Sequence, residues 1–289
     1  MTAPDDRRAE APRAPSTGGL NPARGEADDR RAEAPRAPST GGLNPARGDS
    51  PTLWHDLRRF TEARVGLGRA GNAVPTAAHL DFQEAHAAAR DAVWSALDVE
   101  ALRAELGPVP VLRSEVEDRR SYLLRPDLGR RLRAADRAGL PRTGGTVIVV
   151  ADGLCASGVQ RQAVPLIRAL SAEPPVAPEA RWHIVIVEQG RVAIGDEVGE
   201  AMGAEAVVVL IGERPGLSAQ DSMGAYLTWA PRRGRTDAER NCISNIRPGG
   251  LSAAEAAAKI RWLLRGAKAI GATGVRLKDD MTSTGLALP

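Results

Sequence analysis

Residues 206–246, AVVVLIGERPGLSAQDSMGAYLTWAPRRGRTDAERNCISNI, carry the clearest fold signal in the chain. They open with six consecutive apolar residues, 206–211, that lie between two glycines. A Val-rich run of this length predicts a strand buried on both faces of a parallel sheet. The turn-rich segment 212–216 then ends the strand and places Glu213 just beyond its carboxyl end. Open α/β sheets bind their ligands at that edge, so Glu213 is a candidate binding residue.

The segment that follows, 217–246, has no clean helical or strand period. Long irregular stretches in compact domains are usually either functional or disordered. The apolar content of this stretch argues against disorder. We therefore expect a functional loop around Cys242.

Two further apolar runs, 146–151 and 182–187, predict strands that precede the first one in the chain. Helical patterns at about 157–170, with a kink near Pro165, and at 196–202 separate the three strands. Strand, helix, strand, helix, strand is a βαβαβ unit, which builds a parallel sheet. The predicted fold class is α/β, with a Rossmann-like parallel-sheet domain over residues 141–289.

The end of this domain carries a helix-start signal at Ser252, with Glu255 three residues later, which is the pattern of a capping box. The signal predicts a helix that extends to about Ala269. Residues 274–277 are predicted to form a last strand.

Residues 52–140 read as a mainly helical region. Apolar spacing predicts helices at 76–97, with Leu80, Ala87, Trp94 and Leu97 on one side, and at 99–106. Pro126 begins a further predicted helix that extends to Arg137.

Within that region, residues 66–71 read GLGRAG and match the G-x-G-x-x-G pattern of dinucleotide sites. Such a site needs the motif between a strand and the first turn of a helix. A helix-like segment precedes the motif here, so we interpret it as a glycine-permitted bend between helices.

The first 51 residues contain a duplication, because DDRRAEAPRAPSTGGLNPARG occupies 5–25 and recurs unchanged at 28–48. The segment is rich in proline and charge and has almost no large apolar side chain. It cannot bury enough surface to offset its ordering entropy, so residues 1–51 are predicted to be a disordered tail.

The composition of the chain excludes several function classes. Net charge is only +3 over 289 residues, and no dense basic cluster occurs, which argues against nucleic-acid binding. No apolar run approaches the length of a membrane span, and no secretory signal is present, which argues against a membrane protein. Two cysteines are too few for a disulfide scaffold. We expect a soluble protein of the reducing cytosol.

Several long strings are similar to one known family. They are ARVGLGRAGNAVPT (63–76), YLLRPDLGRRL (122–132), DGLCASGV (152–159), GRVAIGDEVGEAMGAE (190–205), LIGERPGL (210–217) and DSMGAYLTWAPRRGRTDAERNCISNI (221–246). In this order they resemble the small, or light, subunit of ethanolamine ammonia-lyase, from about Leu53 to Lys278.

The resemblance implies an adenosylcobalamin-dependent enzyme that converts ethanolamine to acetaldehyde and ammonia. In that family the barrel of the large subunit binds ethanolamine, and the small subunit forms one wall of the cobalamin site in a hetero-oligomer. By motif, the family's cobalamin contacts fall on Val192, Glu213 and Cys242. No catalytic residue is expected on this chain. The D-x-H-x-x-G motif is absent, so the resemblance implies that the benzimidazole base of the cofactor stays on cobalt.

Without the resemblance, simpler roles fit each of these three residues: Val192 packs, Glu213 pairs with Arg214 in solvent, and Cys242 is a small buried apolar group. Two other functions stay open at this point: a stand-alone Rossmann-like enzyme acting on a nucleotide, and a purely structural subunit. Some relatives carry an amphipathic N-terminal segment that addresses them to a bacterial microcompartment. The duplicated tail lacks that pattern, which leaves the cytosol and the microcompartment as alternative locations.

Overall fold

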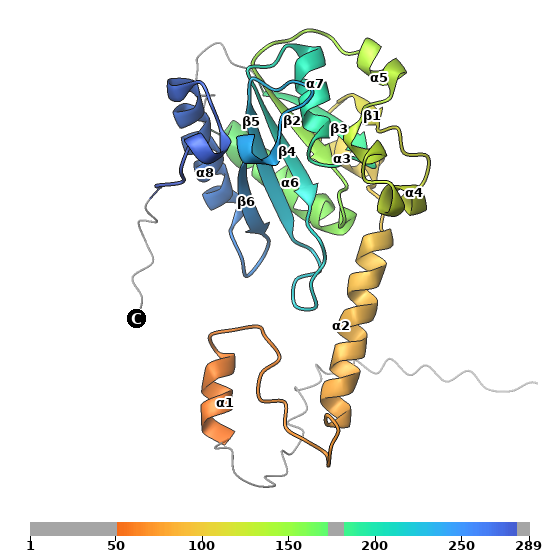
Figure 1. The fold of residues 1–289 in the computed structure, drawn as a ribbon, viewed down its shortest axis with the longest axis vertical. Helices are drawn as coiled ribbons and strands as arrows, with labels where there is room; N and C mark the ends of the chain where they lie inside the picture. The colour runs from red at the N-terminus through yellow and green to blue at the C-terminus, as the bar shows by residue number, and fades with distance from the viewer. Residues whose placement is uncertain (1–50, 173–181, 282–289) are drawn as a thin grey trace, which may run out of the picture. The chain divides into compact units, whose positions relative to one another are not determined.

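A six-stranded sheet forms the centre of the fold (Figure 1). The computed structural model describes residues 51–172 and 182–281. Across the sheet the strands are β1 (Val111–Arg113), β3 (Trp182–Glu188), β2 (Thr146–Ala151), β4 (Ala206–Gly212), β5 (Met223–Trp229) and β6 (Asn241–Ile246). The first four of these run parallel, whereas β5 is antiparallel to both of its neighbours. The predicted α/β class is confirmed at this level.

The predicted βαβαβ unit is present. Strand β2 is followed by α6 (Ala156–Ser171), β3, α7 (Ile194–Met202) and β4. The register places Val149 between Val185 and Val209, and every residue of β4 is buried. A strand buried on both faces has no polar positions, which is why its apolar run was recognisable. Helix α6 runs through Pro165 without interruption.

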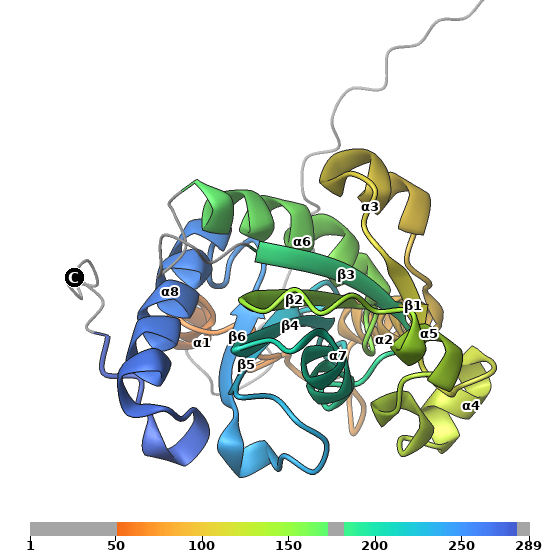
Figure 2. The same cartoon turned by 90° about the horizontal axis from the view of Figure 1, so that it is seen from above.

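Helices cover both faces of the sheet (Figure 2). On one face, α6 and α8 (Ala253–Ile270) enclose a core that includes Ile148, Leu210 and Leu227. Helix α7 packs on the other face, over Val149 and Val209. The capping box of α8 is confirmed, since the side chains of Ser252 and Glu255 each accept from the other residue's backbone amide.

The prediction of an irregular segment over 217–246 was wrong in part. Strands β5 and β6 occupy most of it, and Cys242 lies on β6 rather than in a loop. The register shifts between Met223 and Ala225, and Asn245 has a φ of 60°. These irregularities break the period-2 pattern by which a strand is recognised.

Two predicted elements in other regions were also wrong. The helix expected from Pro126 to Arg137 is replaced by a short 3-10 turn, η1 (Leu128–Arg130), and by α5 (Ala134–Ala138). Between them, the backbone pairs with the end of β1, where the Arg133 amide donates to the Arg113 carbonyl at 3.0 Å. Residues 274–277 form the 3-10 helix η3 (Gly274–Arg276) instead of a strand.

The region 52–140 supplies α1 (Pro51–Arg58), α2 (Thr76–Trp94), α3 (Val99–Leu106) and α4 (Arg119–Leu124), and also the edge strand β1. The apolar side expected for the helix at 76–97 is covered only in part, since Ala87 and Leu97 are partly buried and Leu97 packs against the core. Leu80 and Trp94 are 56% and 54% exposed, and the buried residues are Ala85 and Ala92. Spacing alone predicted an apolar face, but the sheet does not cover Leu80 and Trp94.

The GLGRAG motif lies between α1 and α2, and its three glycines have positive φ values. This position confirms a bend and not the strand-to-helix turn of a dinucleotide site. The duplicated segment predicted to be disordered lies almost wholly outside the described residues, of which Pro51 is the first. Over the described ranges, no helix combines the length and the apolar character needed to cross a membrane.

Candidate functional site

Glu213 lies just beyond the end of β4, and its side chain is held against β5 and β6. Its carboxylate accepts a hydrogen bond from the Ser222 hydroxyl at 2.5 Å and from the Asn245 amide at 3.2 Å. Its side chain also lies against Gly224 on β5, since a Cβ built there would be 3.0 Å from Oε1. A carboxylate has about four acceptor positions, so this one can accept further hydrogen bonds from a ligand. The expected solvent pair with Arg214 is not among the ion pairs that the structure describes.

Cys242 and Tyr226 continue the same face. The two residues lie directly opposite each other in the β5–β6 pairing, and Tyr226 packs at the margin of the core beneath α7. The Cys242 thiol is exposed and lies 3.3 Å from the Ser244 hydroxyl. Burial raises the pKa of the Tyr226 hydroxyl, and the neighbouring Cys242 raises it further. Tyr226 therefore stays neutral and presents a flat, uncharged surface.

Val192 reaches the same side of the sheet from another element. It lies in the loop from β3 to α7, and its carbonyl accepts from the Gly195 amide at 3.1 Å as α7 begins. Gly195 packs directly on Val209 of β4. The side chain of Val192 is half-buried against the core beneath α7. Val192 therefore lies on the α7 side of the sheet beyond β3, whereas Glu213 follows β4 and Cys242 lies on β6, two and four strands further along the sheet.

The crevice that the strand order would create is closed. From β2 the chain passes to β3 on one side, and from β3 it crosses back to β4 on the other side of β2. The switch point therefore lies between β2 and β4. There the Leu154 amide donates to the Gly212 carbonyl at 3.0 Å. A Cβ on Gly153 would lie 2.3 Å from that same carbonyl oxygen. The two backbones therefore fill this crevice.

A buried polar cluster braces this edge of the sheet. Asp152, which is 3% exposed, accepts from the amides of Gln189, Gly190 and Gly153 at 3.0–3.1 Å. Burial raises the pKa of Asp152 to about 6, against the opposing influence of Arg119 and the amide donors. Asp152 is therefore ionised above about pH 6.

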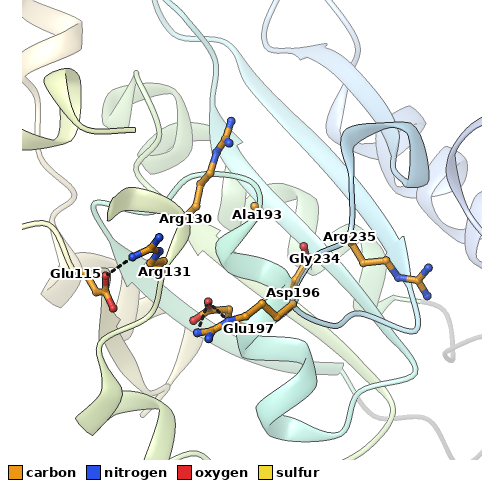
Figure 3. Close-up of a pocket in the computed structure, with 9 residues that line it drawn as sticks. Glu115, Arg130, Arg131, Ala193, Asp196, Glu197, Gly234 and Arg235 are labelled. Atoms are coloured by element: carbon orange, nitrogen blue, oxygen red, sulfur yellow. Dashed lines mark hydrogen bonds and ion pairs between the residues drawn. The ribbon is translucent and has the colours of Figure 1, made fainter. Parts of the chain in front are cut away.

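A cavity of about 400 Å³ lies at the start of α7 (Figure 3). It is lined by Glu115, Arg130, Arg131, Ala193, Asp196, Glu197, Arg233, Gly234 and Arg235. Its charged groups are largely paired within the chain: Glu197 with Arg233 at 2.7 Å, and Glu115 with Arg131 at 3.7 Å. None of the three predicted contact residues lines it. The lining of this cavity is therefore a network of ion pairs, and the cavity lies beside the candidate site.

Sequence reasoning missed Tyr226, Ser222 and the contact of Asp152 with Arg119, although it expected the loop at Asp152 to converge with the loop 188–192 at this edge of the sheet. Tyr226 was hidden because β5 was not recognised as a strand. The partners of Asp152 come from three separate segments, at Arg119, at Gly153 and at 189–190, and no local pattern connects them. The only signal was the Asp-Gly pair that follows an apolar run.

Comparison with known proteins places this geometry in context. The family model described as ethanolamine ammonia-lyase light chain (EutC) matches residues 51–278. The chain is 54% identical over 241 residues to the ethanolamine ammonia-lyase small subunit of Bradyrhizobium diazoefficiens, covering 80% of this chain and 91% of the relative. It is 52% identical over 238 residues to that of Azotobacter vinelandii, with coverage of 78% and 88%. The small subunit of Pseudomonas syringae pv. tomato is 49% identical over 242 residues, with coverage of 78% and 83%.

Proposed function

The chain belongs to the ethanolamine ammonia-lyase light-chain family, and from this membership we propose that it forms one wall of an adenosylcobalamin site. The other wall belongs to a large subunit that binds ethanolamine. The complete enzyme converts ethanolamine to acetaldehyde and ammonia, and its subunits form a hetero-oligomer in the cytosol or in a bacterial microcompartment. The parallel strands with helices on both faces support the Rossmann-like assignment.

The observation that carries this proposal is the open face formed by β5 and β6. It combines an oriented carboxylate on Glu213, an uncharged ring on Tyr226 and an exposed thiol on Cys242. A corrin ring is wide and flat and is fringed with amides. The face offers flat contact area together with acceptors for amide N–H groups, so the residues present fit this cofactor.

Each residue of the chain has a binding role in this arrangement. Glu213 accepts hydrogen bonds from cofactor amide or ribose groups, and its fixed position removes the cost of ordering it on binding. Val192 would supply apolar contact to the cofactor, and Cys242 would contact it through its exposed thiol. Together the three residues exclude water from one side of the site. When bound, adenosylcobalamin supplies the radical chemistry by homolysis of its cobalt–carbon bond.

Glu213→Ala should weaken cobalamin binding by the reconstituted complex more than it slows turnover at saturating cofactor. Losing a hydrogen bond to a charged group costs about 1.5–3 kcal/mol, or roughly 10- to 150-fold in Kd. Glu213→Gln should cost less, since its carbonyl oxygen still accepts. Cobalamin affinity and turnover at saturation, measured side by side, check both variants.

Glu200→Ala is a matched control for this experiment, because Glu200 on α7 forms a partly exposed ion pair with Arg137 on α5. It should leave the Kd for cobalamin within about twofold, since surface ion pairs contribute little. Unchanged affinity with collapsed turnover in Glu213→Ala would assign Glu213 to the reaction or to the fold instead.

Removing residues 1–50 should leave the unfolding temperature, assembly and turnover nearly unchanged. The duplicated segment holds almost no large apolar side chain, and the family match begins at residue 51. The truncated chain is compared with the full chain by thermal unfolding and by assay after reconstitution. A large drop in unfolding temperature, or failure to assemble, would show that the tail is structural.

A further inference from the structure

The loop from β3 to α7, residues 189–192, has a strained start. Gln189 adopts a φ of 57°, in the left-handed region that a side chain disfavours. Such a conformation persists only where the surroundings hold it in place, and it clusters at functional sites. This loop carries Val192, one of the three proposed cobalamin contacts.

The Asp152 carboxylate holds the loop through hydrogen bonds to two of its amides. Its Oδ2 accepts from the Gln189 amide at 3.1 Å, and its Oδ1 accepts from the Gly190 amide at 3.1 Å. Two consecutive amides of the loop thus point at one carboxylate, which comes from the end of β2 at the centre of the sheet. Hydrogen bonds of amides to an ionised carboxylate are short and strong compared with neutral ones.

Helix α4 closes the cluster from the other side. The Arg119 guanidinium lies 3.4 Å from Asp152 and donates to the Gly153 carbonyl at 2.8 Å. The Tyr122 hydroxyl donates to the Gly190 carbonyl at 3.1 Å. The guanidinium carbons of Arg119 and Arg191 lie 4.5 and 4.3 Å from the centre of the Tyr122 ring. The loop is therefore held through both its amide and its carbonyl groups.

We propose that Asp152 is a positioning residue for the cobalamin wall, because it fixes loop 189–192 and so presents Val192 before the cofactor binds. This inference rests on the proposed function and deepens it. Pre-ordering a binding loop raises affinity, since the ordering cost is not incurred on binding. Asp152 itself is 3% exposed, so it would act through the loop and not by direct contact.

The test is Asp152→Asn in the reconstituted complex at pH 8, well above the pKa of Asp152. Asparagine is close in shape but keeps only one acceptor oxygen and turns an N–H₂ group toward the amides. We expect the Kd for adenosylcobalamin to rise about 10- to 100-fold. Turnover at saturating cofactor should stay within about threefold of the wild type, because the loop does not enter the chemistry.

Amide hydrogen exchange in the isolated chain supplies a second readout that needs no cofactor. The Gln189 and Gly190 amides should exchange at least about tenfold faster in Asp152→Asn, whereas amides within β2 and β4 should keep their protection. Asp127→Asn makes the same chemical change in an exposed ion pair with Arg125, and should alter neither affinity nor exchange.

A gentler variant keeps the proposal testable if Asp152→Asn does not fold. Tyr122→Phe removes only the hydroxyl that donates to Gly190, and should raise the Kd about 3- to 10-fold with faster exchange at the loop. Unchanged affinity and unchanged loop exchange in the folded variants would overturn the proposal. A wild-type complex with no cobalamin affinity would instead refute the proposed function, and exchange alone would then decide whether Asp152 holds the loop.

Discussion

Asp196→Ala should lower the free energy of unfolding by about 3–5 kcal/mol, because it leaves a buried guanidinium without its partner. Arg240 donates to both carboxylate oxygens of Asp196 at 2.7 Å, and both side chains are 3% exposed. Arg240 also donates to the Thr228 hydroxyl at 3.0 Å, so the pair joins α7 to the β5–β6 end of the sheet. Loss of the pair should lower Tm by roughly 6–20 °C.

Asp237→Ala is the matched control, because Asp237 also lies near Arg240, at 3.4 Å, but is 89% exposed. That variant should cost no more than about 1 kcal/mol. The double variant Asp196→Leu with Arg240→Met should recover much of the lost stability, since it removes both charges together. Urea unfolding of the four proteins measures these differences. A cost for Asp196→Ala no larger than that for Asp237→Ala would show that the buried pair is not a structural tie.

The purified chain alone should convert no ethanolamine, and activity should appear only when the large subunit and adenosylcobalamin are added. The sequence contains no G-x-S-x-G, H-E-x-x-H or P-loop motif, and its relatives are named as small subunits. Acetaldehyde formation measures the result, with the large subunit plus cofactor as the control that lacks this chain. Acetaldehyde produced by the isolated chain at a rate comparable to the complex would refute the assignment.

The centre of the sheet was predictable from sequence, because β2, β3 and β4 are continuous apolar runs with glycine or polar ends. Helix α8 was predictable because its first turn satisfies its own amides through Ser252 and Glu255. Strands β5 and β6 were not, since a bulge interrupts the alternation that identifies a half-covered strand. The mispredicted helix after Pro126 failed for a different reason, because tertiary pairing with β1 outweighs local helical preference.

In the candidate site, too, the positions of some residues were predictable from the sequence and those of others were not. The position of Glu213 followed from the rule for strand ends, and the structure places it just beyond β4. Cys242 was expected in a loop and lies on a strand, where its neighbour across the sheet is Tyr226. The contacts of Asp152 depend on the approach of α4 and of the β3–α7 loop, which no single stretch of sequence encodes.

The closed crevice between Gly153 and Gly212 has a consequence for how the two subunits associate. If cobalamin lies on the open face formed by β5 and β6, as proposed, this chain covers only one side of it. The affinity for cobalamin and the affinity between the subunits are then linked. If the partner increases the affinity of this chain for cobalamin by some factor, cobalamin increases the affinity of this chain for the partner by the same factor. On the proposed function, the apparent strength of the complex in dilute solution should therefore increase with cobalamin concentration.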